Sequence, residues 1–180
     1  MRALSRPIPG GFVERKTAVL NRNQIKYLVI AAMVIDHFAW AFVTKQETAF
    51  TIMHFIGRLT GPVMAYFLVE GYRHTSNLKR YAIRLGIFGV ISAPFFTYFE
   101  EGTLLTLPQM GVIYTLFLSL IVLILYDRID LPPHIREGGI VVLCLLSIYG
   151  DWAVFDIFYA LIFHKYYKEP KKKWLLYCIA

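Results

Sequence analysis

Residues 24–43 read QIKYLVIAAMVIDHFAWAFV, and this stretch decides the fold class of the chain. As a helix with a rise of ~1.5 Å per residue, a run of this length crosses the ~30 Å of hydrocarbon in a bilayer. Past its middle an acid stands beside an imidazole, at Asp36 and His37. An ionised carboxylate in lipid costs at least ~2.5–3.5 kcal/mol on insertion scales, so Asp36 predicts a partner and a functional site.

The whole chain has the composition of a membrane protein. Of its 180 residues, 57% are hydrophobic and only 17% are charged, and the mean hydropathy is +0.53. The net charge is +7. Because the Lys and Arg residues lie between the apolar runs, we expect anionic lipid headgroups as their partners and no nucleic acid.

Six stretches are candidate membrane spans. The fifth is short and must borrow preceding residues or tilt, and residues 174–180 begin a seventh span that the chain does not complete. We therefore expect a chain truncated at its C-terminus. The sequence predicts an all-α integral membrane protein, with a basic cytoplasmic segment at 1–22 and one polytopic bundle of about six helices at 23–180. The candidate spans are residues 24–43, 52–71, 81–99, 107–126, 137–149 and 152–167.

The distribution of basic residues predicts the orientation. Lys and Arg gather before the first span, in the loop after the second, and behind the sixth. These segments fall on one side of the membrane if all six spans exist, and basic loops face the cytoplasm. The sequence predicts a multi-pass membrane protein with a cytoplasmic N-terminus.

Two groups of polar residues then lie at opposite membrane faces. The outer group joins Asp36 and His37 to His54 and Arg58 of the second span, with Asp151 and Asp156 at the start of the sixth. The cytoplasmic group closes the second span and opens the third. It anchors the helices by the positive-inside rule, or it is a phosphate-binding mouth for a polyanionic cofactor. Its members are Glu70, Arg73, His74, Lys79, Arg80 and Arg84.

Helical geometry separates the two members of the opening pair. Consecutive residues point about 100° apart, so we expect Asp36 to meet His54 or Arg58 on the next helix. His37 lies on the same face as Lys26, three turns or ~16 Å away along the helix. A desolvated neutral histidine suits a general base. The alternative is a satisfied polar pair with only a structural role.

The residues that carry a family resemblance form two blocks. The first has the pattern Met-x-x-Asp-His at 33–37, and the second runs from Gly57-Arg58 to Glu70-Gly71-x-x-His74-Thr75 and on through 79–85. Across residues 20–167 the chain resembles the TraX family. That resemblance implies an inner-membrane protein of conjugation systems, associated with acetylation of the amino terminus of a pilin. The chain departs from the family pattern at residues 151–153, which read Asp-Trp-Ala.

A weaker resemblance links the first span to the broader integral membrane acyltransferases. Those enzymes carry a basic residue followed by ten residues and then a histidine. Here Lys26 and His37 have that spacing, with Lys where those enzymes have Arg, so the bidentate fork is lost.

The resemblances lead to a mechanistic hypothesis, in which an acetyl group passes from acetyl-CoA to an amine or hydroxyl acceptor. Arg73, Lys79, Arg80 and Arg84 would hold the phosphates, with Glu70 and His74 in the same group, and the cofactor arm would pass Lys26. His37 would deprotonate the acceptor, Asp36 would orient the site through His54 or Arg58, and Arg58 would stabilise the oxyanion.

Other classes of function stay open at this stage. A proton- or solute-coupled transporter would use Asp36, His37, His54 and Arg58 as a relay, although no inverted repeat is evident. A non-catalytic membrane scaffold would tolerate replacement of each of these residues. A metal site has no diagnostic ligand spacing.

Overall fold

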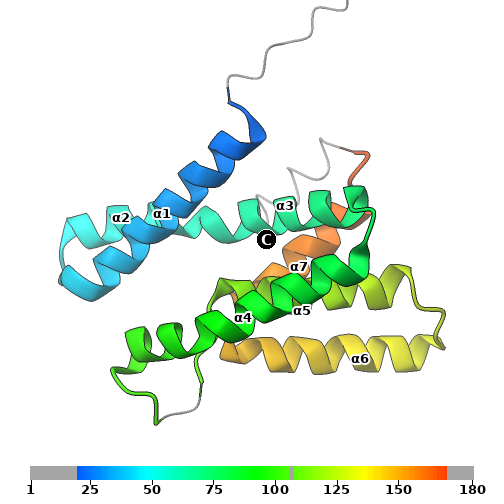
Figure 1. Ribbon diagram of the computed structural model, residues 1–180. Coiled ribbons are helices and arrows are strands. Elements are labelled where there is room, and N and C mark those ends of the chain that lie inside the picture. The colour runs from blue at the N-terminus through cyan, green and yellow to red at the C-terminus, as the bar shows by residue number, and fades with distance from the viewer. Residues whose placement is uncertain (1–19, 106–107, 170–180) are drawn as a thin grey trace, which may run out of the picture.

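The computed structural model describes residues 20–105 and 108–169, and their regular structure is helical apart from one isolated bridge between Met110 and Gly150. This confirms the predicted all-α class (Figure 1). The predicted seventh span and most of the N-terminal segment lie outside the described residues. The helices are α1 (Arg22–Phe42), α2 (Thr48–Arg58), α3 (Thr60–His74), α4 (Leu78–Glu101), α5 (Val112–Asp127), α6 (Pro133–Leu146), the short 3-10 helix η1 (Ser147–Tyr149) and α7 (Ala153–Lys165).

Three helical stretches are long and apolar enough to cross a membrane. They are α1 with 21 residues, the combined α2 and α3 over Thr48–His74 with 27 residues, and α4 with 24 residues. α5 is apolar but has only 16 residues, and α6 and α7 have 14 and 13. The chain is thus a helical membrane protein, while the count of six spans stays a prediction.

The fourth predicted span begins later than expected. We placed its start at residue 107, but α5 starts at Val112 after its N-cap Gly111. The preceding segment pairs instead with the residues before α7: Met110 N–H donates to the Tyr149 carbonyl at 2.7 Å, and Asp151 N–H donates to the Met110 carbonyl at 2.9 Å. This bridge uses backbone groups that a longer helix would have bonded internally.

The second predicted span is divided into two helices just before Pro62. α2 ends at Arg58 and α3 begins at Thr60, with Leu59 between them. Pro62 has no N–H to donate to the carbonyl four residues earlier, which is that of Arg58. Two glycines on either side of this interruption admit close neighbours. A side chain at Gly57 would collide with Asp36, and one at Gly61 would collide with Trp152.

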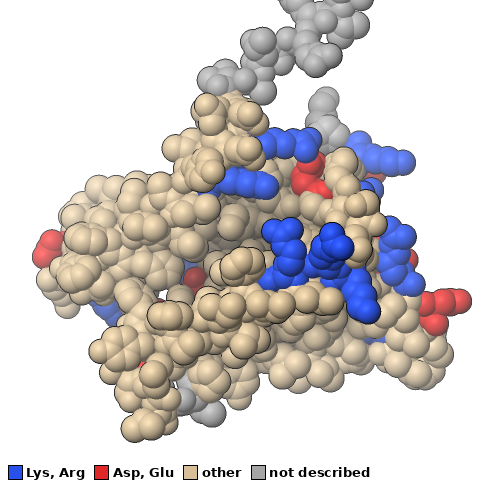
Figure 2. All heavy atoms as spheres, in the orientation of Figure 1, with Lys and Arg blue, Asp and Glu red and all other residues tan. Residues whose placement is uncertain are grey.

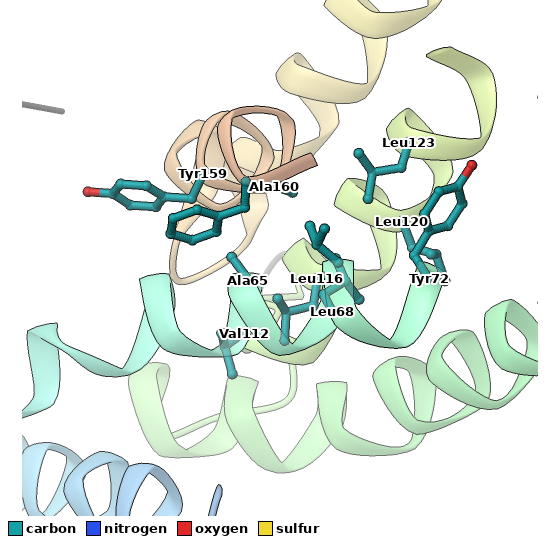
Figure 3. Packing of buried hydrophobic residues seen from close by; sticks show 11 residues of the cluster. Ala65, Leu68, Tyr72, Val112, Leu116, Leu120, Leu123, Tyr159 and Ala160 are labelled. Carbon is teal, nitrogen blue, oxygen red and sulfur yellow. The ribbon is translucent and has the colours of Figure 1, made fainter. Parts of the chain in front are cut away.

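The buried core joins α3, α5 and α7. Side chains from these three helices converge in one cluster, with Leu120 and Leu123 fully buried (Figure 3). The other four long helices, α1, α2, α4 and α6, lie outside this core. They leave many large apolar side chains exposed, as expected for helices that face lipid. The α1–α2 and α4–α5 connections lie at one end of the molecule, and the α3–α4 and α5–α6 connections at the other (Figure 1).

Candidate functional site

A polar pocket of about 250 Å³ opens at the end that holds the α1–α2 and α4–α5 connections. It brings together the four predicted catalytic residues, which come from α1 and α2. We call it the polar pocket. Its lining consists of Asp36, His37, Trp40, His54, Arg58, Phe96, Glu100, Glu101, Gln109, Gly150, Asp151 and Trp152.

Asp36 meets the second helix through His54, one of its two expected partners. Nδ1 of His54 lies 2.7 Å from Oδ1 of Asp36, and Nε of Arg58 lies 3.2 Å from Nε2 of His54. Because the guanidinium can only donate, Nε2 accepts, and the neutral ring carries its proton on Nδ1 and donates it to Asp36. Gly57 lets the two helices come close enough for this chain of contacts, since a Cβ there would overlap Asp36.

Aromatic rings hold the imidazole of His54 and the guanidinium of Arg58 in place. Phe50 stacks on His54 with ring centroids 5.6 Å apart, and the Trp40 indole N–H lies 3.3 Å from His54 Nδ1. Because His54 Nδ1 carries the proton that it donates to Asp36, it has no lone pair to accept the Trp40 N–H. The Trp40 and His54 rings therefore meet edge to face, without a hydrogen bond. Arg58 lies 5.3 Å from the Trp152 ring centroid, a cation–π distance.

Arg58 has donors left over for a ligand. Its Nε is used by His54. Among the described residues, its two terminal nitrogens have no hydrogen-bond partner, and the side chain lines the polar pocket. A guanidinium fixed through Nε and offering further N–H groups can bind an anion or a developing oxyanion.

His37 is separate from the Asp36–His54 contact, as helical geometry predicts. Its Nδ1 lies 2.8 Å from the Met33 carbonyl oxygen. A carbonyl only accepts, so Nδ1 carries the proton and Nε2 of the neutral ring keeps a lone pair. The ring lies against Phe96 and Phe99 of α4, with centroids 5.8 and 5.4 Å away. Its tautomer therefore leaves Nε2 able to accept a proton.

The sequence interpretation missed the wall of the pocket opposite α1 and α2. This wall contains Glu100, Glu101 and Gln109, and Gln109 is held by a bond from its N–H to Thr97 Oγ1 at 3.0 Å. The signal in the sequence was the Glu100-Glu101 pair in a loop without basic residues. In the structure both acids lie in the last turn of α4. Spacing could not predict their approach to His37, because it depends on contact between two helices that are far apart in the chain.

Asp151 joins the polar pocket from the segment before α7, whereas Asp156 does not line it. The side chain of Asp151 is exposed to the pocket, yet desolvation by the surrounding protein raises its pKa, His37 lowers that pKa and Asp36 raises it. Asp156 is fully buried between α7 and α5, with Thr115 Oγ1 at 2.7 Å from its Oδ2. The sequence predicts both acids at one level, and the structure separates them by burial.

The second predicted group lies at the opposite end of the molecule, and part of it is engaged. Glu70 accepts hydrogen bonds from Tyr167 at 2.8 Å and Tyr66 at 3.2 Å, and Arg22 lies 3.3 Å from its other oxygen. Arg73 donates to the His164 carbonyl at 3.1 Å. These contacts tie α1, α3 and the end of α7 together.

The remaining cations at this end face outward. Lys79, Arg80 and Arg84 are exposed on the first turns of α4, and their side chains have no hydrogen-bond or ion-pair partner within the described ranges. Figure 2 shows Lys and Arg side chains gathered where α3 leads into α4. We call this surface, with Arg73, the basic end. His74 Nδ1 lies 2.9 Å from the Glu70 carbonyl, and Lys26 Nζ lies 5.2 Å from the Phe67 ring centroid on α3.

The fold and the pocket define a class: a helical membrane protein with a polar, histidine-containing site at one end of its helices. In the part of the chain that the structure describes, no three His, Cys, Asp or Glu side chains converge on a common point suited to a metal ion.

Comparison with known proteins gives the family. The model of the TraX protein family matches residues 21–179. The chain is also 34% identical over 165 residues to the "Probable fimbrial assembly protein FimC, serogroup H1" of Dichelobacter nodosus, a match that covers 87% of this chain and 67% of the relative. The chain belongs to the TraX family. No solved structure matches it.

Proposed function

We propose that the protein is a membrane-bound acetyltransferase that passes the acetyl group of acetyl-CoA to an amine acceptor, with a hydroxyl acceptor as the alternative. The observation that carries the proposal is that one polar pocket holds both His37 and Arg58. Among the described residues, His37 Nε2 and the terminal nitrogens of Arg58 have no hydrogen-bond partner. Acyl transfer needs a base for the nucleophile and donors for the oxyanion, and these two residues offer them.

In the proposed reaction the acceptor nitrogen attacks the thioester carbonyl carbon, and His37 Nε2 takes a proton from that nitrogen. Arg58 stabilises the negative charge on the carbonyl oxygen in the tetrahedral intermediate. The C–S bond then breaks, the amide forms, and the proton held by His37 goes to the departing thiolate to give coenzyme A. Asp36 acts through His54, which positions Arg58 by accepting its Nε–H.

We assign the donor to the basic end. Coenzyme A carries several phosphate charges, and within residues 20–105 and 108–169 the exposed side chains of Lys79, Arg80 and Arg84 have no hydrogen-bond or ion-pair partner that competes for them. Lys26 lies three turns of α1 from His37, and an extended cofactor arm would cover the ~16 Å between these two levels. Anionic lipid headgroups would compete for the same cations.

The family relationship supports a pilus subunit as the acceptor. The relative from Dichelobacter nodosus is named a fimbrial assembly protein, and the TraX resemblance implies acetylation of a pilin amino terminus. We place the protein in the inner membrane, crossing it several times, with a cytoplasmic N-terminus and the polar pocket toward the outer face. In this arrangement a cytosolic donor serves an acceptor held in the membrane.

The test is mass spectrometry of membrane proteins and cell-envelope polymers from cells with and without the protein, after supply of isotopically labelled acetyl-CoA to isolated membranes. We expect one component to gain a labelled acetyl group only when the protein is present. Absence of any labelled product would refute the acetyltransferase, and pH-driven solute flux in vesicles would then identify the protein as a transporter.

A further inference from the structure

Three hollows of the molecule meet at His37. One is the polar pocket, and the other two are apolar, with volumes of about 290 and 360 Å³. The first apolar hollow lies between α1 and α4 over the start of α5. The second continues along the exposed side of α1. Both contain Met33, His37 and Phe99. We call the two apolar hollows together the lateral groove. Its further lining includes Val34, Phe38, Ala41, Phe42, Phe95 and Ile113.

The lateral groove opens toward the lipid. Phe38, Phe42 and Phe95 are 53%, 75% and 74% exposed, which in a membrane means contact with hydrocarbon. In Figure 2 the surface is hollowed between α1 and α4. α1 packs chiefly on α2 and α3, so its contact with α4 at this level is made by the rings of His37, Phe96 and Phe99. The lateral groove therefore gives a path to His37 from the side of the helices as well as from the end that holds the polar pocket.

We propose that the lateral groove is the acceptor subsite, and that it takes the first apolar turns of a membrane-inserted polypeptide whose amino terminus lies in the polar pocket. This inference rests on the proposed acetyl transfer and adds the route and the residues that admit the acceptor. The groove supplies apolar walls for the stem of the acceptor. His37, at the junction, faces the nitrogen that reacts.

Charge distinguishes this occupant from a phospholipid with an amine headgroup. The polar pocket is lined by four carboxylic acids and one arginine. A peptide amino terminus enters as an ammonium group without a phosphate, so it suits this lining. It releases its extra proton to water before the neutral nitrogen attacks, and the remaining proton then goes to His37. A phosphate would be repelled by the same acids.

A second lipid-facing hollow on the other side of α4 provides a control. It has a volume of about 450 Å³, is lined by apolar residues of α4 and α5, and contains no titratable side chain. Val90 in that hollow and Val34 in the lateral groove are matched positions, 72% and 60% exposed. Val34→Trp therefore fills the groove, and Val90→Trp makes the same change where no acceptor is expected.

The experiment uses the full chain in vesicles of phosphatidylcholine and phosphatidylglycerol, which contain no primary amine. The probe is a synthetic Leu/Ala transmembrane peptide with a free amino terminus and a photoreactive residue in its second turn. We expect crosslinks on α1 and α4 residues of the groove, reduced about tenfold or more by Val34→Trp and unchanged by Val90→Trp. A crosslink yield that is unchanged by Val34→Trp, or crosslinks that form mainly on α6, would refute the groove as the acceptor subsite.

Labelled acetyl-CoA in the same vesicles separates this inference from the proposed function. Transfer to the membrane peptide is compared with transfer to a short soluble peptide that has the same first residues. We expect Val34→Trp, and independently Ala41→Phe if the first variant does not insert, to lower the ratio of membrane to soluble transfer about tenfold. Transfer to neither peptide would refute the acetyltransferase, while the crosslinks would still decide the groove. An unchanged ratio would refute the groove alone.

Discussion

The polar pocket and the basic end carry similar numbers of charged residues but are built differently. In the pocket, Asp36, His54 and Arg58 form a chain of contacts at 2.7 and 3.2 Å, and His37 is oriented by a backbone carbonyl. At the basic end, Lys79, Arg80 and Arg84 are exposed and have no hydrogen-bond or ion-pair partner among the described residues. We therefore expect activity to be sensitive to the exact position of side chains in the pocket, and at the basic end to be sensitive only to the number of positive charges.

Replacement of Arg58 should produce the largest difference between the two regions. Arg58→Ala removes the oxyanion donors and should lower kcat for acetyl transfer by about 10²–10³-fold. Arg58→Lys keeps the charge but loses both the Nε donor to His54 and the planar fork, so it should restore little. The matched change at the basic end, Arg84→Lys, should leave kcat unaltered within twofold. Equal behaviour of the two Arg→Lys variants would contradict the distinction.

Gly57→Ala tests the close approach of α1 and α2. A methyl group at this position would collide with Asp36, so the helices must separate or the acid must turn. We expect a loss of about 1–3 kcal/mol in the free energy of unfolding, with reduced transfer because His54 loses its partner. Gly138→Ala on α6 is the control, since a Cβ there meets nothing within 4 Å. Thermal unfolding in detergent measures both, and similar midpoints for the two variants would show that Asp36 needs no close helix.

Removal of positive charge at the basic end should weaken the binding of acetyl-CoA and leave the chemical step unchanged. The triple change Lys79→Gln, Arg80→Gln and Arg84→Gln should raise KM for acetyl-CoA about tenfold at low salt and leave kcat near its original value. The effect should shrink as salt rises, because exposed charges are screened. A fall in kcat with constant KM would move these residues out of the donor site.

The smallest effect is expected at the contact that ties α7 to α3. Tyr167→Phe removes the hydrogen bond to Glu70 at 2.8 Å and should cost about 1 kcal/mol. Tyr166→Phe is the neighbouring control and should stay within about 0.5 kcal/mol of the original protein. Equal thermal midpoints for the two variants would mean that Glu70 does not stabilise this end.

The fold class and half of the pocket followed from the sequence because they depend on local patterns. Apolar run length predicts helices, and the 100° step between Asp36 and His37 predicts that each contacts a different neighbour. The match to the TraX family over residues 21–179 includes the motif blocks, which lie on α1 and from the end of α2 into α4.

The rest of the pocket depends on long-range contacts that no local pattern encodes. The late start of α5 and the position of Asp151 both follow from the backbone bridge between Met110 and Gly150. Glu100 and Glu101, in the last turn of α4, reach the pocket because α4 lies beside α1 at His37, where Phe96 and Phe99 contact the imidazole. The burial of Asp156 likewise follows from its contact with Thr115, 41 residues earlier in the chain.

The central claim is that His37 is the base of an acetyl-transfer centre. Its most direct test is the rate of labelled acetyl transfer from acetyl-CoA by the full chain in vesicles, compared among the original protein, His37→Ala and His134→Ala, an exposed histidine on α6. We expect His37→Ala to insert normally and lose about 10²–10⁴-fold in rate, while His134→Ala transfers at the original rate. Transfer by His37→Ala at the original rate would contradict the account.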